Sequence, residues 1–339
     1  MLTHLQKGVL VAIGTALVAA CSSSNSSPSA PAASKPLAVA YAAIGASDAV
    51  GYGATVPCTE ASPALVADPT CPEPGANGYV PDIRTDLGQY GFAAALQDLG
   101  ISGAVIGPDI EATGNMYSSV AGATPCQART PGVDAIPANF LQNELPKVNP
   151  GATLVTVFAG GNDVNAIVNA IACGAGGTTS ASVQAYITTQ VTAFGGDFLA
   201  LLNGVHARAP AATIVVANIP NFANVPYALG FPLSLREALQ GVSVAFDTYV
   251  INTAATKGVP VVDLQCNPDS YIPANFYTDG FHPNDAGYAL LAGLFVKQVL
   301  SDYPTAPQAQ CSEQAISGVS ADVRLSPPLL STKPAFPAR

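Results

Sequence analysis

The chain has 339 residues, of which 49% are hydrophobic and 10% are charged, and its formal net charge is -10. This length allows one sizeable hydrophobic core. The 31 glycines and 29 prolines predict many turns, and because they do not recur at a fixed spacing they argue against a fibrous protein. The chain has no run of Lys or Arg that could neutralise several phosphates, which argues against nucleic acid as a partner.

Residues 1–21 have the pattern of an export signal. A small positive charge precedes a short apolar run over Gly8–Ala20, and Val18–Cys21 resembles a lipobox, the small-residue site that is cut before a lipid-modified cysteine. The apolar run is too short for a comfortable transmembrane span. Residues 22–36 are rich in Ser, Pro and Ala, as in a linker. We therefore expect an exported protein that is anchored at the cell envelope, in the membrane, through lipidated Cys21. An ordinary signal peptide with a chance cysteine is the alternative.

The other cysteines also favour export. Six remain after Cys21, and an even number in an exported chain predicts three disulfides: Cys58, Cys71, Cys126, Cys173, Cys266 and Cys311. Six cysteines allow fifteen pairings, among which Cys58 with Cys71 is favoured because both lie in one Pro-rich loop. Metal binding is the rival interpretation, but the chain has no C-x-x-C or His-x-His cluster, so we expect no metal and no cofactor.

The first half of the domain contains one clear strand and one clear helix. Leu37–Gly45 is a short apolar run that ends in glycine, which predicts a buried strand. Residues 55–77 form a Pro-rich loop, and Val80–Tyr90 has helical spacing. Three weaker expectations follow, namely a strand over Ala93–Gly103, irregular structure over Pro108–Gly132 and a helix over Asn139–Leu145.

The second half alternates strands with helices. Predicted strands cover Thr153–Ala159, Ala212–Ile219 and Val259–Leu264. Predicted helices cover Val164–Ala172, Ser182–Arg208 with a break at Gly195–Gly196, Leu233–Lys257, and Pro283–Leu300 with Pro283 in the first turn.

This alternation predicts an α/β fold, in which a parallel sheet carries helices on both faces as a three-layer α/β/α sandwich. We expect one domain over residues 37–302, followed by a C-terminal extension over 303–339 whose tail after Cys311 is a strap or a loose end. In such folds ligands bind beyond the carboxyl ends of the strands, so functional residues should follow the strands.

Only two of the three histidines are candidates for a catalytic base, because His4 lies in the predicted signal peptide. His206 ends a predicted helix, where a cation suits the helix dipole. His282 follows Asp279 by three residues, and a carboxylate can orient an imidazole so that its second nitrogen is free as a base. In the alternative interpretation, Asp279 caps backbone amides.

Three other residues follow predicted strands or turns. Ser47 comes directly after the first strand, where a tight turn presents a side chain at the sheet edge; alternatively it caps a helix. Asn162 follows the clearest strand and could donate to a developing oxyanion, or could occupy a left-handed turn. Gly103 lies in a turn from which its N–H could point into the same site.

Four segments together resemble the SGNH hydrolase family, also called GDSL esterases and lipases. The resemblance extends from about Val39 to about Leu300 and depends on the segments Gly45-Ala46-Ser47, Asp98–Ala104, Gly161-Asn162-Asp163 and Asp279–Pro283. It departs from the family pattern at Ala46, where the family usually has Asp, and at Asp98, where it often has Asn.

The resemblance implies a flavodoxin-like five-stranded parallel sheet, no metal, and a role for each matching residue. Ser47 corresponds to the nucleophile, Asp279 and His282 to its acid and base. The Ser47 and Gly103 amides and the Asn162 side chain correspond to the oxyanion hole.

The expected function is therefore that of a serine esterase or lipase, with a small-molecule or lipid ester as substrate. A carbohydrate O-deacetylase uses the same triad and remains an alternative, as does a non-catalytic surface lipoprotein that binds a ligand. The apolar segment Val225–Phe231 forms either an acyl-binding wall or ordinary core. A nucleotide or flavin protein is disfavoured because no G-x-G-x-x-G follows the first strand.

Overall fold

The structure, a computed structural model, describes residues 37–58, 75–117, 126 and 136–318. Its centre is a five-stranded parallel sheet in the order β2-β1-β3-β4-β5. The strands are β1 (Leu37–Ile44), β2 (Phe92–Asp98), β3 (Leu154–Phe158), β4 (Thr213–Ala217) and β5 (Val261–Val262). This order is that of the flavodoxin-like doubly wound folds, so the predicted fold class is confirmed.

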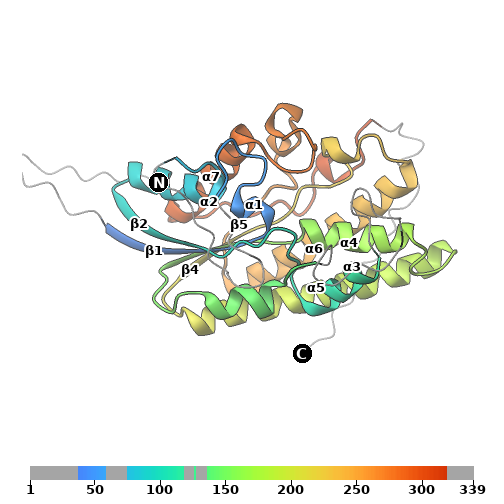
Figure 1. Cartoon of the computed structure of the whole chain (residues 1–339), viewed down its shortest axis with the longest axis horizontal. Helices are drawn as coiled ribbons and strands as arrows, with labels where there is room; N and C mark the ends of the chain where they lie inside the picture. Colours follow the sequence, from blue (N-terminus) through green and yellow to red (C-terminus); the bar gives the residue numbers. More distant parts are fainter. Residues whose placement is uncertain (1–36, 59–74, 118–125, 127–135, 319–339) are drawn as a thin grey trace, which may run out of the picture. The chain divides into compact units, whose positions relative to one another are not determined.

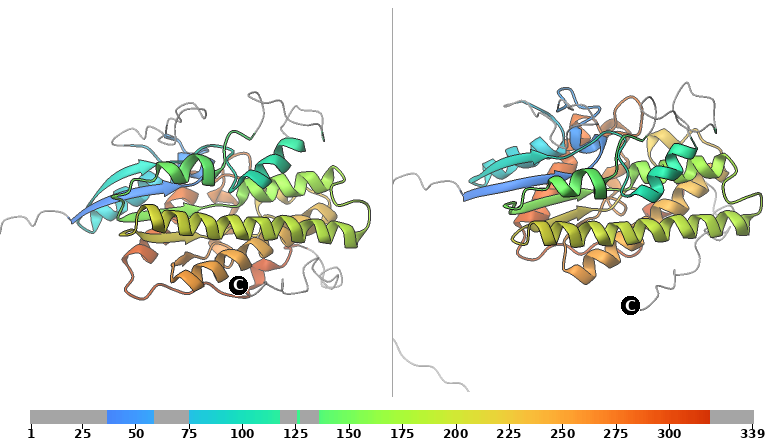
Figure 2. Two further views of the ribbon diagram at one scale, coloured as in Figure 1. Left: turned by 90° about the horizontal axis from the view of Figure 1, so that it is seen from below. Right: turned by 60° about the horizontal axis from the view of Figure 1, so that its bottom comes forward.

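The strands are apolar on both faces because each face of the sheet packs against helices. Alternate residues of β4 show this: Ile214 and Val216 belong to one core, and Val215 and Ala217 to the other. The first core also contains side chains of α3 (Pro108–Met116), α4 (Gly161–Ala172), α5 (Ser180–Arg208) and α6 (Leu233–Lys257). The second contains side chains of α2 (Tyr79–Gln89) and α7 (Asp285–Leu300). The three layers are visible in Figure 1, and the long helix α5 runs along one face of the sheet in Figure 2.

Short helices connect these elements, especially beyond the carboxyl ends of the strands. The helix α1 (Ser47–Val50) follows β1. The others are η1 (Phe140–Glu144), η2 (Leu145–Lys147), η3 (Pro226–Ala228), η4 (Pro268–Tyr271), η5 (Pro273–Asn275) and η6 (Ser312–Gln314).

Two predicted elements differ from the observed ones. The segment predicted to be irregular contains α3, which begins with Pro108 and has two acidic residues in its first turn, an arrangement that favours a helix start. The helix α5 is continuous through Gly195–Gly196. A Cβ at Gly195 would lie 2.0 Å from the ring of Tyr249, so this glycine lets α5 approach α6 closely.

Three further predictions are wrong in detail. The strand predicted over six residues is only two residues long as β5, and the predicted helix at Asn139–Leu145 is a π-helical turn followed by a 3-10 turn. Pro283 lies before α7 rather than in its first turn. The cap is Asn284, whose side chain accepts hydrogen bonds from the N–H groups of Ala286 and Gly287.

Two complete disulfides lie within the described residues, Cys126–Cys173 and Cys266–Cys311. Cys58 is also disulfide-bonded. Its predicted partner Cys71 lies outside the described residues, as does Cys21.

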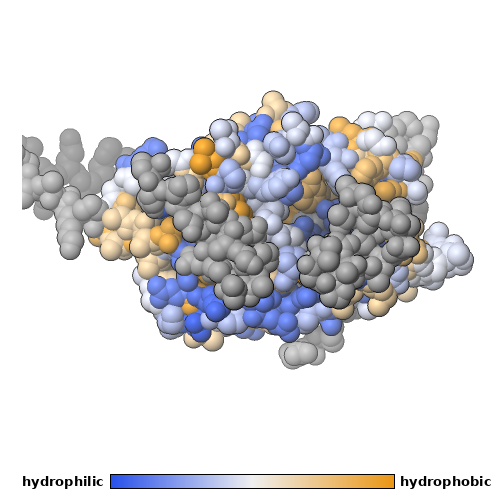
Figure 3. Space-filling view, in the orientation of Figure 1, coloured by the Kyte–Doolittle hydropathy of each residue, from blue (hydrophilic) through white to orange (hydrophobic). Residues whose placement is uncertain are grey.

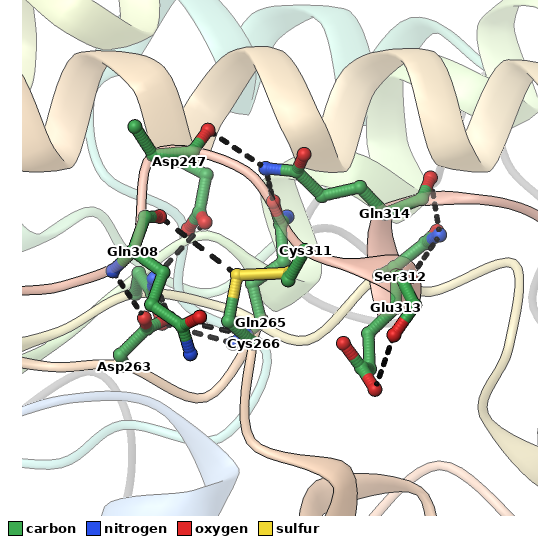
Figure 4. The surroundings of a disulfide bond; sticks show 12 residues. Asp247, Asp263, Gln265, Cys266, Gln308, Cys311, Ser312, Glu313 and Gln314 are labelled. Carbon is green, nitrogen blue, oxygen red and sulfur yellow. Dashed lines mark hydrogen bonds between the residues drawn. A yellow bond between two sulfur atoms is a disulfide. The ribbon is translucent and has the colours of Figure 1, made fainter.

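The described part of the C-terminal extension packs on the domain as a strap. Figure 4 shows the Cys266–Cys311 bridge that holds it, next to Asp263, whose carboxylate accepts from the Gln308 N–H. Further along, backbone carbonyls of residues 313–315 accept hydrogen bonds from the side chains of Asn221 and Asn224.

Exposed large apolar residues of the described segments come from many different elements. The face seen in Figure 3 mixes hydrophobic and hydrophilic residues, which is usual for a folded domain. Among the helices of the described segments, none combines the length and apolarity needed to cross a bilayer.

Candidate active site

Ser47 lies at the carboxyl end of β1, as predicted. The turn before it is held by the Gly45 N–H, which donates to Oε2 of the buried Glu144 at 3.0 Å. Ser47 is the first residue of α1 and is only 6% exposed. The residue in the cap position is Ala46, so Ser47 is not a helix cap and its hydroxyl is available for another partner.

That partner is His282, 235 residues further along the chain. The Ser47 Oγ lies 2.8 Å from Nε2 of His282, and the Nδ1 of the same ring lies 2.7 Å from Oδ2 of Asp279. The other carboxylate oxygen of Asp279 accepts from the backbone N–H groups of Phe281 and His282 at 2.9 and 3.0 Å. The carboxylate thus contacts the imidazole with one oxygen and accepts from the local backbone with the other, so the two interpretations of the D-x-x-H pattern do not exclude each other.

The hydrogen bonds around Asp279 also determine its charge. Desolvation alone would raise its pKa, but the hydrogen bonds from the His282 ring and from the backbone N–H groups of His282 and Phe281 outweigh it, and the pKa is lowered. Asp279 is therefore ionised at neutral pH. An ionised carboxylate at this position stabilises an imidazolium on His282.

Residues that follow β2 and β3 lie close to the first group, since Ala104 and Asn162 line one small hollow together with Ala46. Asn162 is in the first turn of α4, and its Nδ2 donates to the Ala104 carbonyl at 2.9 Å. The next residue, Asp163, accepts from the Ile106 N–H at 2.9 Å. The start of α4 therefore holds the loop that contains Gly103. Asn162 is helical, so it is not the left-handed turn residue of the alternative interpretation.

Two backbone N–H groups, one at Ser47 and one in the Gly103 loop, are available as hydrogen-bond donors. Gly103 has φ +82, a conformation that favours glycine. Within the described segments, neither the Ser47 N–H nor the Gly103 N–H has a hydrogen-bond acceptor. Asp98, which departs from the family pattern, accepts from the Gly100 N–H at 3.0 Å and so still braces the turn.

An apolar cavity lies beside these residues at the same edge of the sheet. Asp48, Phe281 and Pro283, the sequence neighbours of Ser47 and His282, contribute to its wall, together with Phe158, Phe222, Leu264 and Leu291. The segment Val225–Phe231 is not part of this wall. Its Val225 and Ala228 are fully buried in the core, and its Tyr227 and Phe231 pack against each other, with Tyr227 also against Phe281.

The remaining candidates lie elsewhere. His206 is exposed in the last turn of α5, as its helix-end position suggests. Across the described residues there is no group of three or more His, Cys, Asp or Glu side chains that could hold a metal ion.

Several residues that support the site were not predicted from sequence. Glu144 holds the turn before Ser47, and Asp163 holds the Gly103 loop. Burial raises the pKa of Asp163 to about 7, and the nearby Asp197 adds to this increase. The only available signal was that Asp163 directly follows Asn162. For Glu144 the local sequence contains no signal.

The family follows from a match over most of the domain. The model of the GDSL-like lipase/acylhydrolase family matches residues 43–290. The chain belongs to this family. As a GDSL-like hydrolase it is a carboxylic ester hydrolase, and its disulfides are consistent with export.

Solved structures with a similar fold include three hydrolases. An extracellular lipase from Streptomyces rimosus is 17% identical, with a TM-score of 0.47, and the match covers 76% of this chain and 97% of that one. A phospholipase A1 from Streptomyces albidoflavus NA297 is 21% identical, with a TM-score of 0.46 and coverage of 76% and 97%. An acetyl xylan esterase variant from Geobacillus stearothermophilus is 15% identical, with a TM-score of 0.46 and coverage of 80% and 99%. No curated protein sequence matches the chain.

Proposed function

We propose that this GDSL-like hydrolase is a serine esterase in which Ser47 is the nucleophile, His282 the base and Asp279 the residue that orients the base. The observation that carries the proposal is the continuous hydrogen-bond chain from Ser47 Oγ through the His282 ring to Asp279, at 2.8 and 2.7 Å. Both distances are within the range expected of a nucleophile, its base and the group that orients the base.

The reaction follows from this geometry. The His282 Nε2 takes the proton of Ser47 as Oγ attacks the ester carbonyl, and Asp279 stabilises the resulting imidazolium. The oxyanion of the tetrahedral intermediate accepts hydrogen bonds from the Ser47 and Gly103 N–H groups and from the Asn162 side chain. His282 then gives the proton to the leaving alcohol, and a water activated by the same ring hydrolyses the acyl-enzyme.

The substrate that the site supports best is an ester with an apolar acyl group. The cavity whose wall includes Asp48 and Phe281, the sequence neighbours of Ser47 and His282, is lined mainly by aromatic and aliphatic side chains, which is the environment that an acyl chain prefers. A carbohydrate O-deacetylase would use the same catalytic residues. A series of aryl esters of increasing acyl length, compared with acetylated sugars, separates the two activities, and we expect higher kcat/KM for butyryl than for acetyl esters.

A ligand-binding protein without catalysis is less well supported. Binding alone does not require an oriented imidazole against a buried hydroxyl, whereas hydrolysis does.

The test of the proposal is hydrolysis of p-nitrophenyl butyrate by Ser47→Ala. We expect loss of turnover, because the proposed mechanism forms the acyl-enzyme on Ser47. Ser234→Ala, which removes an exposed hydroxyl from the first turn of α6, is the matched control and should keep full activity. Wild-type activity in Ser47→Ala would end the assignment.

We also propose that the protein is lipid-anchored after export through Cys21. The proposal depends on the lipobox-like Val18–Cys21 and the linker after it. Metabolic labelling with a fatty acid tests it: the label should be incorporated into the wild type and not into Cys21→Ser.

A further inference from the structure

The segment of residues 51–55 connects the two halves of the site. It follows α1, the helix that begins with Ser47, and the Tyr52 N–H donates to the Ser47 carbonyl at 2.9 Å. On its other side, the Tyr52 carbonyl accepts from the hydroxyl of Tyr288 in α7 at 2.6 Å. Tyr52 is therefore bonded to the residue that carries the nucleophilic hydroxyl and to the helix that follows His282.

Further contacts fix this segment to the start of α7. Both carboxylate oxygens of Asp285 accept hydrogen bonds from Thr55, one from its N–H at 2.7 Å and one from its hydroxyl at 2.5 Å. Gly53 has φ +93, and a Cβ there would lie 2.7 Å from the Pro283 carbonyl oxygen. The 51–55 segment thus lies directly against the residues that flank His282 in sequence.

The side chain of Tyr52 packs on the imidazole itself. The centroids of the Tyr52 and His282 rings are 4.5 Å apart, with an angle of 51° between their planes. The ring of Tyr277 meets Tyr52 edge-on, with centroids 6.1 Å apart. Tyr52 is 48% exposed, so its ring covers the imidazole at the surface and is not part of the buried core.

The hydrogen bonds of His282 restrain one motion of its ring only weakly. Hydrogen bonds to imidazole nitrogens are strongest in the plane of the ring, so the bonds to Ser47 and Asp279, at 2.8 and 2.7 Å, hold Nε2 and Nδ1 in place but resist a tilt about the line between these atoms only weakly. An aromatic ring packed on the imidazole opposes this tilt. Misplacement of a catalytic group by about 1 Å can cost a hundredfold in rate, so this restraint matters for turnover.

We propose that Tyr52 is a positioning residue of the hydrolase site: its ring keeps the His282 imidazole facing Ser47, and the 51–55 segment fixes that ring relative to both α1 and α7. The proposal rests on the proposed function of Ser47 and His282. Tyr52 acts through His282 and takes no part in bond making. The hydroxyl of Tyr52 is not needed for this role, because the packing involves the ring.

The test compares Tyr52→Ala and Tyr52→Phe in the full chain, with p-nitrophenyl butyrate as substrate. In Tyr52→Ala we expect kcat to fall by about tenfold or more while KM changes less than about twofold, because positioning affects the chemical step. Tyr52→Phe keeps the ring and should retain kcat within about twofold of the wild type. Tyr90→Ala removes another exposed tyrosine, at the end of α2, and should match the wild type.

Three results would overturn the proposal. A higher KM with unchanged kcat in Tyr52→Ala would make Tyr52 a substrate contact. A lower Tm with unchanged kcat in the folded fraction would make it purely structural. Loss of kcat in Tyr52→Phe equal to that in Tyr52→Ala would assign the role to the hydroxyl. A failure of the proposed function itself would give a different result, namely full activity of Ser47→Ala.

Discussion

The carboxylate of Asp279 makes three hydrogen bonds, and exchanging it for an amide separates its two roles. In the wild type, Oδ1 of Asp279 accepts from the Phe281 and His282 N–H groups at 2.9 and 3.0 Å. In Asp279→Asn, the amide oxygen can take over both of these hydrogen bonds. The NH2 group of the asparagine then takes the place of Oδ2, which in the wild type lies 2.7 Å from Nδ1 of His282. A donor facing Nδ1 favours the tautomer with the proton on Nε2, which cannot take a proton from Ser47.

The expected loss of kcat is about 10⁴-fold, the effect of the corresponding exchange in a serine protease triad, which corresponds to about 5.5 kcal/mol. Hydrolysis of p-nitrophenyl butyrate measures it, with Asp302→Asn at an exposed position as the matched control. The Tm of Asp279→Asn should remain close to that of the wild type. Asp279→Ala also loses the two backbone bonds and should be less stable, by about 1 kcal/mol for each bond. More than a tenth of the wild-type kcat in Asp279→Asn would refute this account of His282.

Three other predictions concern the oxyanion donor, a buried acid and a disulfide. Asn162→Ala should lower kcat by about a hundredfold or more, measured with the same ester; a drop below threefold would remove Asn162 from the oxyanion hole. Burial raises the pKa of Asp163 from 3.8 to about 7, so the folded protein keeps a proton that the unfolded chain releases, and stability falls as the pH rises between these values. The Tm of Asp163→Asn minus the Tm of the wild type should therefore be more positive at pH 8 than at pH 5. An equal Tm difference at both pH values would contradict the raised pKa of Asp163. Cys266→Ala with Cys311→Ala opens a link over 45 residues, which should lower the free energy of unfolding by about 4 kcal/mol in a denaturant titration; a loss below about 1 kcal/mol would show that the strap is held by its other contacts.

The sheet could be predicted because its strands are nearly continuous apolar runs. Most residues in β1, β3 and β4 face one of two cores on either side, so these strands are largely apolar and differ clearly from their surroundings. The helix α3 lacks such a signal, because only Ile110 and Gly114 of its nine residues are buried. The continuity of α5 through Gly195 depends on the ring of Tyr249, which lies on another helix and cannot be inferred from local sequence.

The predicted site residues are those whose position depends on a strand end or on a short motif. Ser47 and Asn162 follow β1 and β3, and Asp279 is three residues from His282, so local sequence was enough to suggest each of them. The residues that hold them were not predicted. Glu144 contacts the turn at Gly45 across 99 residues, and Tyr52 meets His282 only after the two ends of the domain come together.

The central claim is that Ser47 is an activated nucleophile, and reaction with a fluorophosphonate tests it most directly. Such a reagent forms a stable bond only with a serine whose proton is removed by a neighbouring base. The account predicts stoichiometric labelling at Ser47, located by peptide mass spectrometry, and strongly reduced labelling in His282→Ala. An unlabelled protein, or labelling at another serine, would contradict it.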